Sequence, residues 1–470
     1  MGCRWIFTTK IAADGKIDRY KARLVAQGYT QTHGIDYEET FAPVAKLNSI
    51  RILISLAANL DWNLHQLDVK NAFLNGKLEE VVYMKMPPGF DGEKKDVVCK
   101  LNKSLYGLKQ SPRAWFTRFS TTMKQLGYVQ SQADHTLFVK KSIDGKRAIL
   151  IVYVDDMVIT GDDNNEIDNL KNCLQAEFKV KDLGQLQYFL GMEIARSKKG
   201  IFISQRKYTL DLLQETGKLG CKPATTPLDR NWKLKITDDD PLVERERYQR
   251  LVGKLIYLSL TRPDIAYSVS VVSQFMHSPR KKHLDAVNQI LRYLKGTPGK
   301  GLLFSKSENR SVECFADADW AGSVEDSKST TGYCTKVWGN LVTWRSKKQS
   351  VVARSSAEAE YRAIAQGVCE LIWIKRLLHD LFIPIQEPVK LYSDSQSAIS
   401  IVHNPVQHDR MKHVRIDRNF IKSEMESGTF SLHYVPTKSQ EADILTKALL
   451  KSEFELNVGK LGMTNIYSPV

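Results

Sequence analysis

The most constraining feature of the sequence is an apolar run that two aspartates interrupt. Residues 151–161 read Ile-Val-Tyr-Val-Asp-Asp-Met-Val-Ile-Thr-Gly. Valine, isoleucine and tyrosine favour strands whereas aspartate does not, so the run predicts a β-hairpin with Asp155 and Asp156 at its tip. Adjacent carboxylates repel each other, and their burial is costly unless a cation neutralises them. A surface turn also accounts for an Asp-Asp pair, so the rest of the chain has to decide between the two interpretations.

Length and composition narrow the class of protein. A chain of 470 residues is too long for one ordinary core, so we expect two to four domains. The formal net charge of +15 favours a polyanionic partner. Nucleic acid is favoured over a membrane, because no apolar run is long enough to span a bilayer and the first residues resemble neither a signal peptide nor a myristoylation motif. Seven scattered cysteines without a Cys-x-x-Cys pair predict reduced thiols, an intracellular soluble protein and no zinc site.

Basic residues alternate in a predicted strand near the start. Residues 20–26 read Tyr-Lys-Ala-Arg-Leu-Val-Ala and follow an Asp-Gly turn, which predicts the second strand of a hairpin. Lys21 and Arg23 are two residues apart and therefore share one face of the strand. A solvated basic edge and a strand that grips phosphates both fit this pattern.

A carboxylate and an aromatic residue follow in the next predicted strand and turn. Residues 64–69 read Leu-His-Gln-Leu-Asp-Val, which predicts a strand with Asp68 near its end, where a carboxylate is suited to hold a cation. Phe73 comes five residues later, and by itself it is more typical of a core residue than of a binding residue.

Glycine or proline interrupts two further segments of predicted structure. Residues 104–115 predict a loop that opens a helix, and Lys109 and Arg113 bracket that helix start, where phosphates are favoured. Residues 188–194 read Tyr-Phe-Leu-Gly-Met-Glu-Ile and predict a strand interrupted by Gly191. A glycine inside a strand often marks a close approach of another group to the backbone.

A second set of acids lies in the last third of the chain. Residues 315–320 and 389–394 each end a predicted strand in carboxylates. A predicted helix after Ser355 carries a glutamate in its first turn, and residues 440–443 open a last predicted helix. Any one of these acids is by itself more typical of a surface acid or a helix cap. Acids from four separated segments are nevertheless what a two-metal nuclease needs.

Several blocks in a fixed order resemble the reverse transcriptase of Ty1/copia-type retrotransposons. The later acids resemble the ribonuclease H domain of the same family. The resemblance implies a multidomain α/β and α+β protein: a right-hand polymerase with fingers, palm and thumb, followed by a connection and a ribonuclease H-like mixed-sheet domain. The expected divisions are residues 1–228 for fingers and palm, 229–310 for thumb and connection, 311–450 for ribonuclease H and 451–470 for a tail. The matching blocks are residues 20–28, 66–76, 104–115, 153–156 and 189–194.

The resemblance also implies roles in the polymerase part. Asp68, Asp155 and Asp156 match the catalytic palm carboxylates that bind two Mg²⁺ ions, with Mn²⁺ as a substitute. Phe73 matches an aromatic ring that excludes the ribose 2′-hydroxyl. The segment with Phe189 and Gly191 matches the one that grips the primer. The further candidate substrate-binding residues are Lys21, Arg23, Lys109, Gln110 and Arg113.

In the nuclease part the resemblance implies four catalytic, metal-binding carboxylates. The matching residues are Asp317, Glu360, Asp394 and Asp443. Asp319 competes for the first position, and Asp317 is preferred because it directly follows the predicted strand. Cellular ribonucleases H place a histidine before the last acid, whereas residues 435–439 read Val-Pro-Thr-Lys-Ser.

The sequence therefore predicts an RNA-directed DNA polymerase with ribonuclease H activity, both acting by two-metal phosphoryl transfer. The expected partners are an RNA template, a DNA primer, RNA–DNA hybrid and dNTPs. By resemblance the chain is a polyprotein fragment of a transposable element with a DNA integration pathway, located in a cytoplasmic virus-like particle. The alternative is a truncated or degenerate remnant that at most binds nucleic acid, since the resemblance begins within the fingers. Residues 311–470 alone are expected to keep some Mg²⁺-dependent cleavage.

Overall fold

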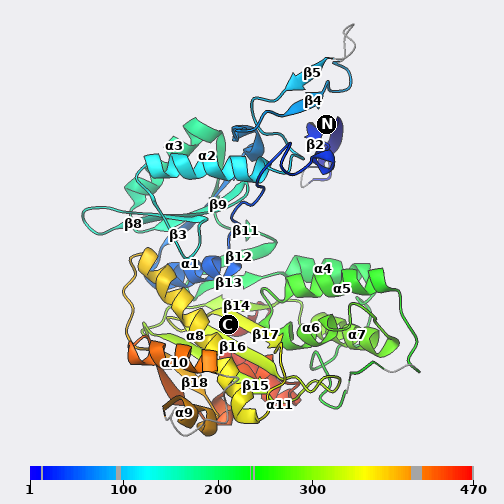
Figure 1. The fold of residues 1–470 in the computed structure, drawn as a ribbon, viewed down its shortest axis with the longest axis vertical. Helices are drawn as coiled ribbons and strands as arrows, with labels where there is room; N and C mark the ends of the chain where they lie inside the picture. Colours follow the sequence, from blue (N-terminus) through cyan, green and yellow to red (C-terminus); the bar gives the residue numbers. More distant parts are fainter. Residues whose placement is uncertain (12–13, 91–96, 233, 237–238, 404–414, 468–470) are drawn as a thin grey trace. The chain divides into compact units, whose positions relative to one another are not determined.

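The computed structural model describes residues 1–11, 14–90, 97–232, 234–236, 239–403 and 415–467. The chain divides into two compact units (Figure 1). The first unit contains residues 1–46 and 63–186, and the second contains residues 47–62 and 187–470. Across the described ranges, no helix combines the length and the apolar character that crossing a membrane requires.

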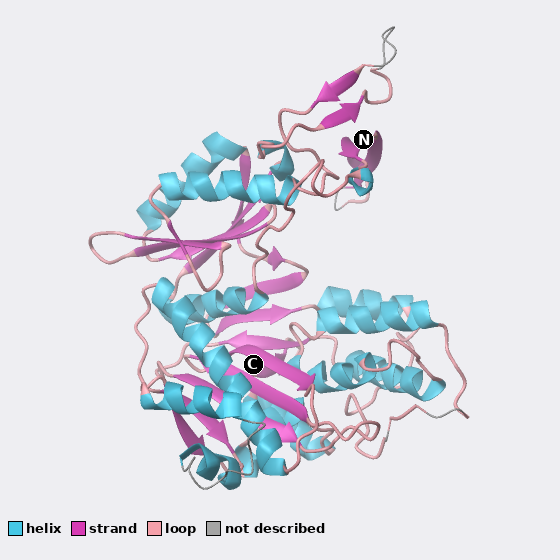
Figure 2. Ribbon diagram, viewed as in Figure 1, coloured by secondary structure: helices cyan, strands magenta, loops and turns pink. Residues whose placement is uncertain are grey.

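An antiparallel sheet forms the centre of the first unit. Its six strands run in the order β10-β3-β9-β8-β7-β6. Two helices, α2 and α3, cover one face of this sheet (Figure 2) and bury Trp115, Phe119 and Leu170 against it. The elements are β3 (Asn63–Val69), α2 (Ser111–Gln125), β6 (Val129–Gln130), β7 (Leu137–Lys141), β8 (Arg147–Tyr153), β9 (Asp156–Gly161), α3 (Asn164–Phe178) and β10 (Val180–Gln185).

Two hairpins complete the first unit. One pairs β1 (Cys3–Ile11) with β2 (Ile17–Ala26), and the other pairs β4 (Tyr83–Lys85) with β5 (Val98–Lys100). The end of β2 approaches the loop before α2 so closely that a Cβ on Gly107 would lie 2.2 Å from the Ala26 carbonyl oxygen. Gly107 also has a φ of 92°, so two independent reasons require glycine there.

Two five-stranded sheets organise the described part of the second unit. One has the order β11-β12-β13-β14-β20, and the other has the order β17-β16-β15-β18-β19. The second sheet is mixed, because β15 pairs antiparallel with β16 but parallel with β18. The strands of the mixed sheet are β15 (Val312–Asp319), β16 (Thr330–Val337), β17 (Asn340–Lys348), β18 (Val389–Ser393) and β19 (Phe430–Tyr434). The strands of the other sheet are β11 (Tyr188–Phe189), β12 (Met192–Ser197), β13 (Gly200–Ser204), β14 (Lys300–Phe304) and β20 (Met463–Asn465).

Helices cover both sheets of the second unit. The long helix α8 crosses the mixed sheet (Figure 1), and a Cβ on its Gly367 would lie 3.1 Å from the Cys314 sulfur of β15. The absence of a side chain there lets the helix lie close to the strands. The helices are α1 (Leu47–Leu60), α4 (Arg206–Glu215), α5 (Arg245–Leu258), α6 (Ala266–Ser273), α7 (Lys281–Gly296), α8 (Ser356–Asp380), α9 (Gln396–His403), α10 (Arg415–Glu426) and α11 (Lys451–Lys460).

Helix α1 belongs to the second unit although its sequence lies between β2 and β3 of the first. Arg51 of α1 is 4% exposed and donates to the carbonyl oxygens of Val342 and Leu260, each at 2.6 Å. Ser55 donates to the Val337 carbonyl at 2.8 Å. These contacts tie α1 to strands β16 and β17 of the mixed sheet and to the turn that follows α5.

Some of the local predictions from the sequence are confirmed and others are corrected. The hairpin of residues 151–161 and the strand that carries Asp68 are present, whereas residues 188–194 form a hairpin and not one interrupted strand, because β11 and β12 pair antiparallel and Gly191 lies in the turn between them. The last predicted helix is different, because the residues after Gln440 form a short 3₁₀ helix, Glu441–Leu445, and α11 begins only at Lys451. A mixed α/β architecture is therefore established, whereas the fingers, palm and thumb arrangement and the expected domain divisions stay predictions.

Candidate metal centres

The first set of acids lies where β3, β8 and β9 meet. Asp68 of β3 is directly opposite Asp156 of β9, and Asp156 is also opposite Tyr153 of β8. The tip of the hairpin is an uncommon turn, because Val154 has a φ of 57°, a left-handed conformation that β-branched residues rarely adopt. The turn is held from one side, since the Trp115 indole N–H donates to the Val154 carbonyl at 2.7 Å.

Burial and mutual repulsion shape the electrostatics of this set. Burial raises the pKa of Asp155; the Asp68 carboxylate raises it further, whereas Arg23 and Lys21 oppose the shift. Burial also raises the pKa of Asp156, and the neighbouring Asp155 adds to that effect. All three acids are half-buried. The cationic strand β2 is thus close enough to influence the acids, as a phosphate-gripping strand would have to be.

An aromatic pair lies beside the same acids. The Phe73 and Tyr106 rings pack edge to face with centroids 5.1 Å apart, and the Arg23 guanidinium carbon lies 6.0 Å from the Tyr106 ring centroid. Burial raises the pKa of Tyr106, and the charges of Asp155 and Asp68 add to this. Phe73 is only partly buried against the core. Tyr106 was missed by the sequence analysis, although it lies within one of the matching blocks.

Three predicted substrate-binding residues have partners inside the protein. Gln110 is 2% exposed and donates to the Asp36 carbonyl at 3.0 Å. The Lys109 ammonium donates to the Tyr37 hydroxyl at 3.1 Å, and Arg113 forms an ion pair with Glu39 at 3.0 Å. These contacts give Lys109, Gln110 and Arg113 a part in holding the loops together, and their predicted role in substrate binding stays a prediction.

The predicted primer-gripping segment lies in the second unit. Phe189 is buried, with 1% exposure, and Gly191 has a φ of 75°. A Cβ on Gly191 would lie 2.3 Å from the Tyr257 hydroxyl oxygen, and that hydroxyl donates to the Leu190 carbonyl at 2.5 Å. The expected close approach at Gly191 is therefore confirmed, and the approaching group is a tyrosine of α5, but Gly191 lies in the turn between β11 and β12 and not within a strand.

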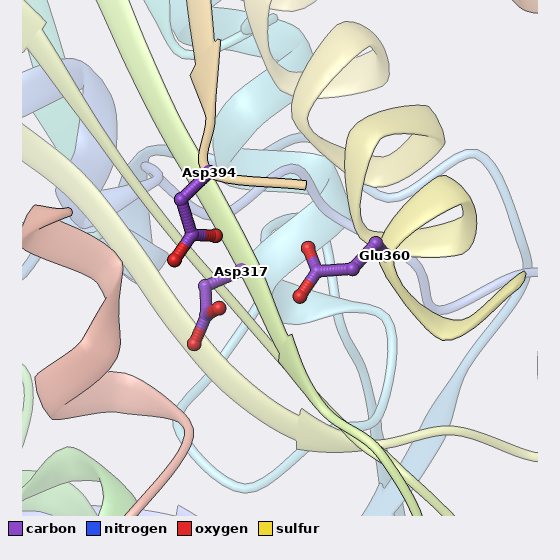
Figure 3. A group of neighbouring side chains, drawn as sticks. All are labelled: Asp317, Glu360 and Asp394. Atoms are coloured by element: carbon purple, nitrogen blue, oxygen red, sulfur yellow. The ribbon is translucent and has the colours of Figure 1, made fainter. Parts of the chain in front are cut away.

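The second set of acids converges in the mixed sheet of the second unit. Asp317 comes from β15, Glu360 from the first turns of α8, and Asp394 directly follows β18. Figure 3 shows the carboxylates of Asp394 and Glu360 turned toward that of Asp317, and one oxygen of each of the three lies within 4.8 Å of the others. Ser355 caps α8 by accepting from the Glu358 N–H, as the sequence predicted for this serine. Asp319 lies outside this group.

Burial perturbs these acids strongly. Burial raises the pKa of Glu360 to about 9, and the charges of Asp317 and Asp394 contribute to the rise. Burial likewise raises the pKa of Asp443 to about 7, with Asp317 adding to it and Lys447 opposing it. Glu360 accepts a hydrogen bond from the Ala318 N–H through one oxygen, whereas its other oxygen, which is buried, has no partner among the described residues.

Residues that the sequence analysis did not single out surround this second set. Thr446 donates from its hydroxyl to Asp317, and Thr437 donates to Asp394 at 2.8 Å. The Lys447 ammonium lies 2.9 Å from an Asp443 oxygen and 4.0 Å from an Asp317 oxygen. Thr446 and Lys447 follow Asp443 by three and four residues. Residues at this spacing share one face of a helical turn, so the sequence did contain a signal that these two lie beside Asp443.

The donor atoms fit a hard divalent cation. All four candidate ligands are carboxylates, and Mg²⁺ prefers oxygen ligands of this kind. One Glu360 oxygen has no partner among the described residues, and the raised pKa values show that the protein alone stabilises the ionised form of these acids poorly, which a bound cation would do better. Asp317, Glu360 and Asp394, with Asp443 nearby, could therefore hold such an ion, and so could Asp68, Asp155 and Asp156.

The amino-acid sequence is similar to those of known reverse transcriptases and transposon polyproteins. The family described as reverse transcriptase (RNA-dependent DNA polymerase) matches residues 1–230. A Pol polyprotein from transposon RE1 of Arabidopsis thaliana is 46% identical over 99% of the chain, and one from a transposon of Nicotiana tabacum is 42% identical over 98%. The chain spans only 32% and 35% of the lengths of these two polyproteins.

A shorter relative is matched along its whole length. A putative transposon Ty5-1 protein of Saccharomyces cerevisiae is 35% identical over 65% of the chain and 100% of its own length. Among solved structures, ribonuclease H1 from Halobacterium salinarum aligns with 29% of the chain and 94% of its own at 16% identity, with a TM-score of 0.23, which is too low to establish a common fold. The sequence relatives suffice: the chain belongs to the reverse transcriptase family of Ty1/copia-type retrotransposon Pol polyproteins.

Proposed function

We propose that the chain is the RNA-directed DNA polymerase and ribonuclease H portion of a copia-type LTR retrotransposon polyprotein. The observation that carries this proposal is the pairing of Asp68 with Asp156 at the tip of the Asp155–Asp156 hairpin, in a chain of this family. The convergence of Asp317, Glu360 and Asp394 in the other unit supports the nuclease. Two separate acid sets imply two separate reactions.

In the polymerase, Asp68, Asp155 and Asp156 would hold two Mg²⁺ ions. When bound, such ions make the primer 3′-hydroxyl more acidic and offset the charge of the triphosphate. Arg23 and Lys21, which already influence Asp155, would bind the triphosphate oxygens of the incoming dNTP. The Phe73 ring, supported edge-on by Tyr106, would leave no room for a ribose 2′-hydroxyl.

In the nuclease, Asp317, Glu360, Asp394 and Asp443 would hold the cations. When bound, these ions would make a water more nucleophilic toward the RNA strand. Glu360 and Asp317 are nearly buried, so their carboxylates would be fixed in place before the substrate arrives. The 2′-hydroxyls and the A-form geometry would identify the RNA of a hybrid.

The proposed partners follow from the reaction and the charge. An RNA template, a DNA primer, the RNA–DNA hybrid and dNTPs are all polyanions, and the net charge of +15 favours them. The arrangement as fingers, palm and thumb and the location in a cytoplasmic virus-like particle are part of the same proposal and rest on family membership.

The test is one reaction with two readouts. The purified 470-residue chain is given a labelled RNA template with an annealed DNA primer, dNTPs and MgCl₂. We expect primer extension and, once hybrid has formed, shortening of the RNA, with both abolished by EDTA. A chain that binds the hybrid but performs neither reaction would be the degenerate remnant, and the proposal would be wrong.

A further inference from the structure

A lysine side chain, that of Lys447, lies among the second set of acids. Lys447 follows the 3₁₀ helix Glu441–Leu445 by two residues and lies four residues after Asp443. Its ammonium is 2.9 Å from an Asp443 oxygen and 4.0 Å from an Asp317 oxygen, so it bridges two of the four acids. The carboxylates it contacts are nearly buried, with 10% and 4% side-chain exposure.

The charges at this place are unequal. Four carboxyl groups, those of Asp317, Glu360, Asp394 and Asp443, share a single ammonium among the ion pairs that the described residues form with them. The two threonine hydroxyls that also reach these acids are neutral donors. Those of the four groups that are ionised repel one another strongly in so poorly solvated a place, so Lys447 removes part of a repulsion that would otherwise spread the acids apart.

The cavity beside Lys447 gives its ammonium space to move away from the acids. The Lys447 side chain is 37% exposed, in contrast to the acids that it contacts. It lines a cavity of about 790 Å³ together with Thr437, Lys438, Asp319 and Trp232. A rotation of the long side chain into this space would take the ammonium away from the acids without moving the backbone, because lysine side chains have several flexible bonds.

We propose that Lys447 is an internal counter-ion, which occupies the place of a divalent cation while none is bound and is displaced into the cavity when one binds. This inference rests on the proposed nuclease function, because it assumes that the four acids hold a cation. Lys447 is therefore a positioning residue: it keeps the acids assembled in the metal-free protein and competes with the metal for the same oxygens.

A competitor has a measurable signature that a merely structural residue lacks. Removing the Lys447 ammonium lowers the stability of the metal-free protein but strengthens metal binding, because the divalent cation no longer has to displace the ammonium. Loss of an ordinary structural contact would loosen the site, and it would lower both the stability of the metal-free protein and its affinity for the metal. The opposite signs of the two effects separate the interpretations.

The test compares three variants in an Asp155→Asn background, which weakens the contribution of the polymerase acids. Lys447→Met keeps the apolar stem without the charge, and Lys447→Arg keeps the charge. Lys438→Met is the matched control, since Lys438 lines the same cavity but forms no ion pair with these four described acids. The measurements are the melting temperature in EDTA and the dissociation constant of Mn²⁺ by calorimetry, both without nucleic acid.

For Lys447→Met we expect a lower melting temperature in EDTA and an Mn²⁺ dissociation constant lower by about fivefold, which is the size of effect that a partly exposed ion pair gives. Lys447→Arg and Lys438→Met should stay close to the background protein in both measurements. Unchanged or weaker Mn²⁺ binding in Lys447→Met overturns the inference while leaving the nuclease proposal intact. A background protein that binds no Mn²⁺ and cuts no hybrid overturns both.

Discussion

The two sets of acids differ in how far the fold assembles them before any cation binds. In the second unit, Asp317, Glu360 and Asp394 bring three oxygens within 4.8 Å of one another. In the first unit, Asp68 and the hairpin acids are half-buried, and within the described residues they do not form a group of that kind. The same side-chain chemistry is thus preassembled in one place and left open in the other.

The difference follows from what carries each acid. Glu360 comes from a capped helix that is packed on a sheet, and Asp317 comes from a central strand of that sheet, so neither backbone can move easily. Asp155, in contrast, lies at the tip of a hairpin beside the left-handed Val154. Preassembly has an electrostatic cost, which is visible in the pKa of Glu360 of about 9. An open site avoids that cost until the substrate and its cations arrive.

The largest expected effect separates the two sets by function. Asp155→Asn should reduce dNTP incorporation by more than about 100-fold and leave hybrid cleavage nearly unchanged, because loss of a direct metal ligand exceeds the 10- to 100-fold cost of losing a supporting residue. Glu360→Gln should do the reverse. Both rates are measured on one primed template with folded protein, as judged by circular dichroism. Joint loss of both activities in either variant would mean that the sets do not act independently.

The stability of the second unit should depend on a residue outside the nuclease sequence. Arg51→Met leaves the carbonyls of Val342 and Leu260 without their buried donor, which should reduce the free energy of unfolding by about 2–4 kcal/mol. The control is Arg19→Met, because Arg19 is exposed and among the described residues its ion pair is with Asp18; this change should alter the free energy of unfolding by less than about 0.5 kcal/mol. Denaturant titration measures both.

The same contacts affect the expectation that residues 311–470 function alone. That fragment lacks α1, whose Arg51 and Ser55 donate to the backbone of β16 and β17. We therefore expect residues 311–470 to cut hybrid weakly, and to recover activity when a peptide of residues 47–62 is added. Equal cleavage with and without the peptide would show that the helix is dispensable.

The pH dependence of metal-free stability should come mainly from the preassembled set. The folded-state pKa of Glu360 is about 9 and that of Asp443 about 7, against ordinary values of 4.5 and 3.8, so the folded protein holds these protons more tightly than the unfolded chain. Stability contributed by these groups is therefore greatest at low pH and falls as the pH rises from about 4 to about 9.

Melting temperatures in EDTA and in MgCl₂ measure this dependence. We expect the EDTA values to fall across that range and the stabilisation by Mg²⁺ to grow, because the cation binds deprotonated carboxylates. Glu360→Gln should flatten both trends, whereas Asp155→Asn should leave them largely in place. A rise of metal-free stability with pH would contradict the assigned shifts.

The smallest expected effect concerns sugar selection in the open set. Phe73→Ala should raise ribonucleotide incorporation relative to deoxyribonucleotide by about tenfold, the scale on which an apolar pocket discriminates small groups. Tyr106→Ala should shift the ratio in the same direction but less, because it removes only the support of the Phe73 ring. An unchanged ratio in competition assays would leave Phe73 as a core residue.

Local features were readable from the sequence, and long-range pairings were not. The hairpin with Asp155 at its tip follows from strand propensity and from the position of the acids, both of which act over a few residues. The close approach at Gly191 was predicted, but its partner Tyr257 lies more than sixty residues away and no pattern announced it. Likewise nothing local indicated that Asp68 would pair with Asp156.

Helix α1 and Lys447 illustrate the same limit. The polar residues Arg51, Ser55 and Asn59 recur every four residues in an otherwise apolar helix, which indicates a buried polar stripe but not the strand it meets. Lys447 shares a helical face with Asp443, yet a lysine on such a spacing is usually a solvated surface residue. Its role depends on acids from three other segments, so only the assembled fold reveals it.

Calorimetric titration of Mn²⁺ into the nucleic acid-free chain tests the contrast between the two sets most directly. Preassembly predicts a binding event that Asp155→Asn retains and Glu360→Gln abolishes, because only the nuclease acids are assembled without substrate. Persistence of that event in Glu360→Gln together with its loss in Asp155→Asn would contradict the account.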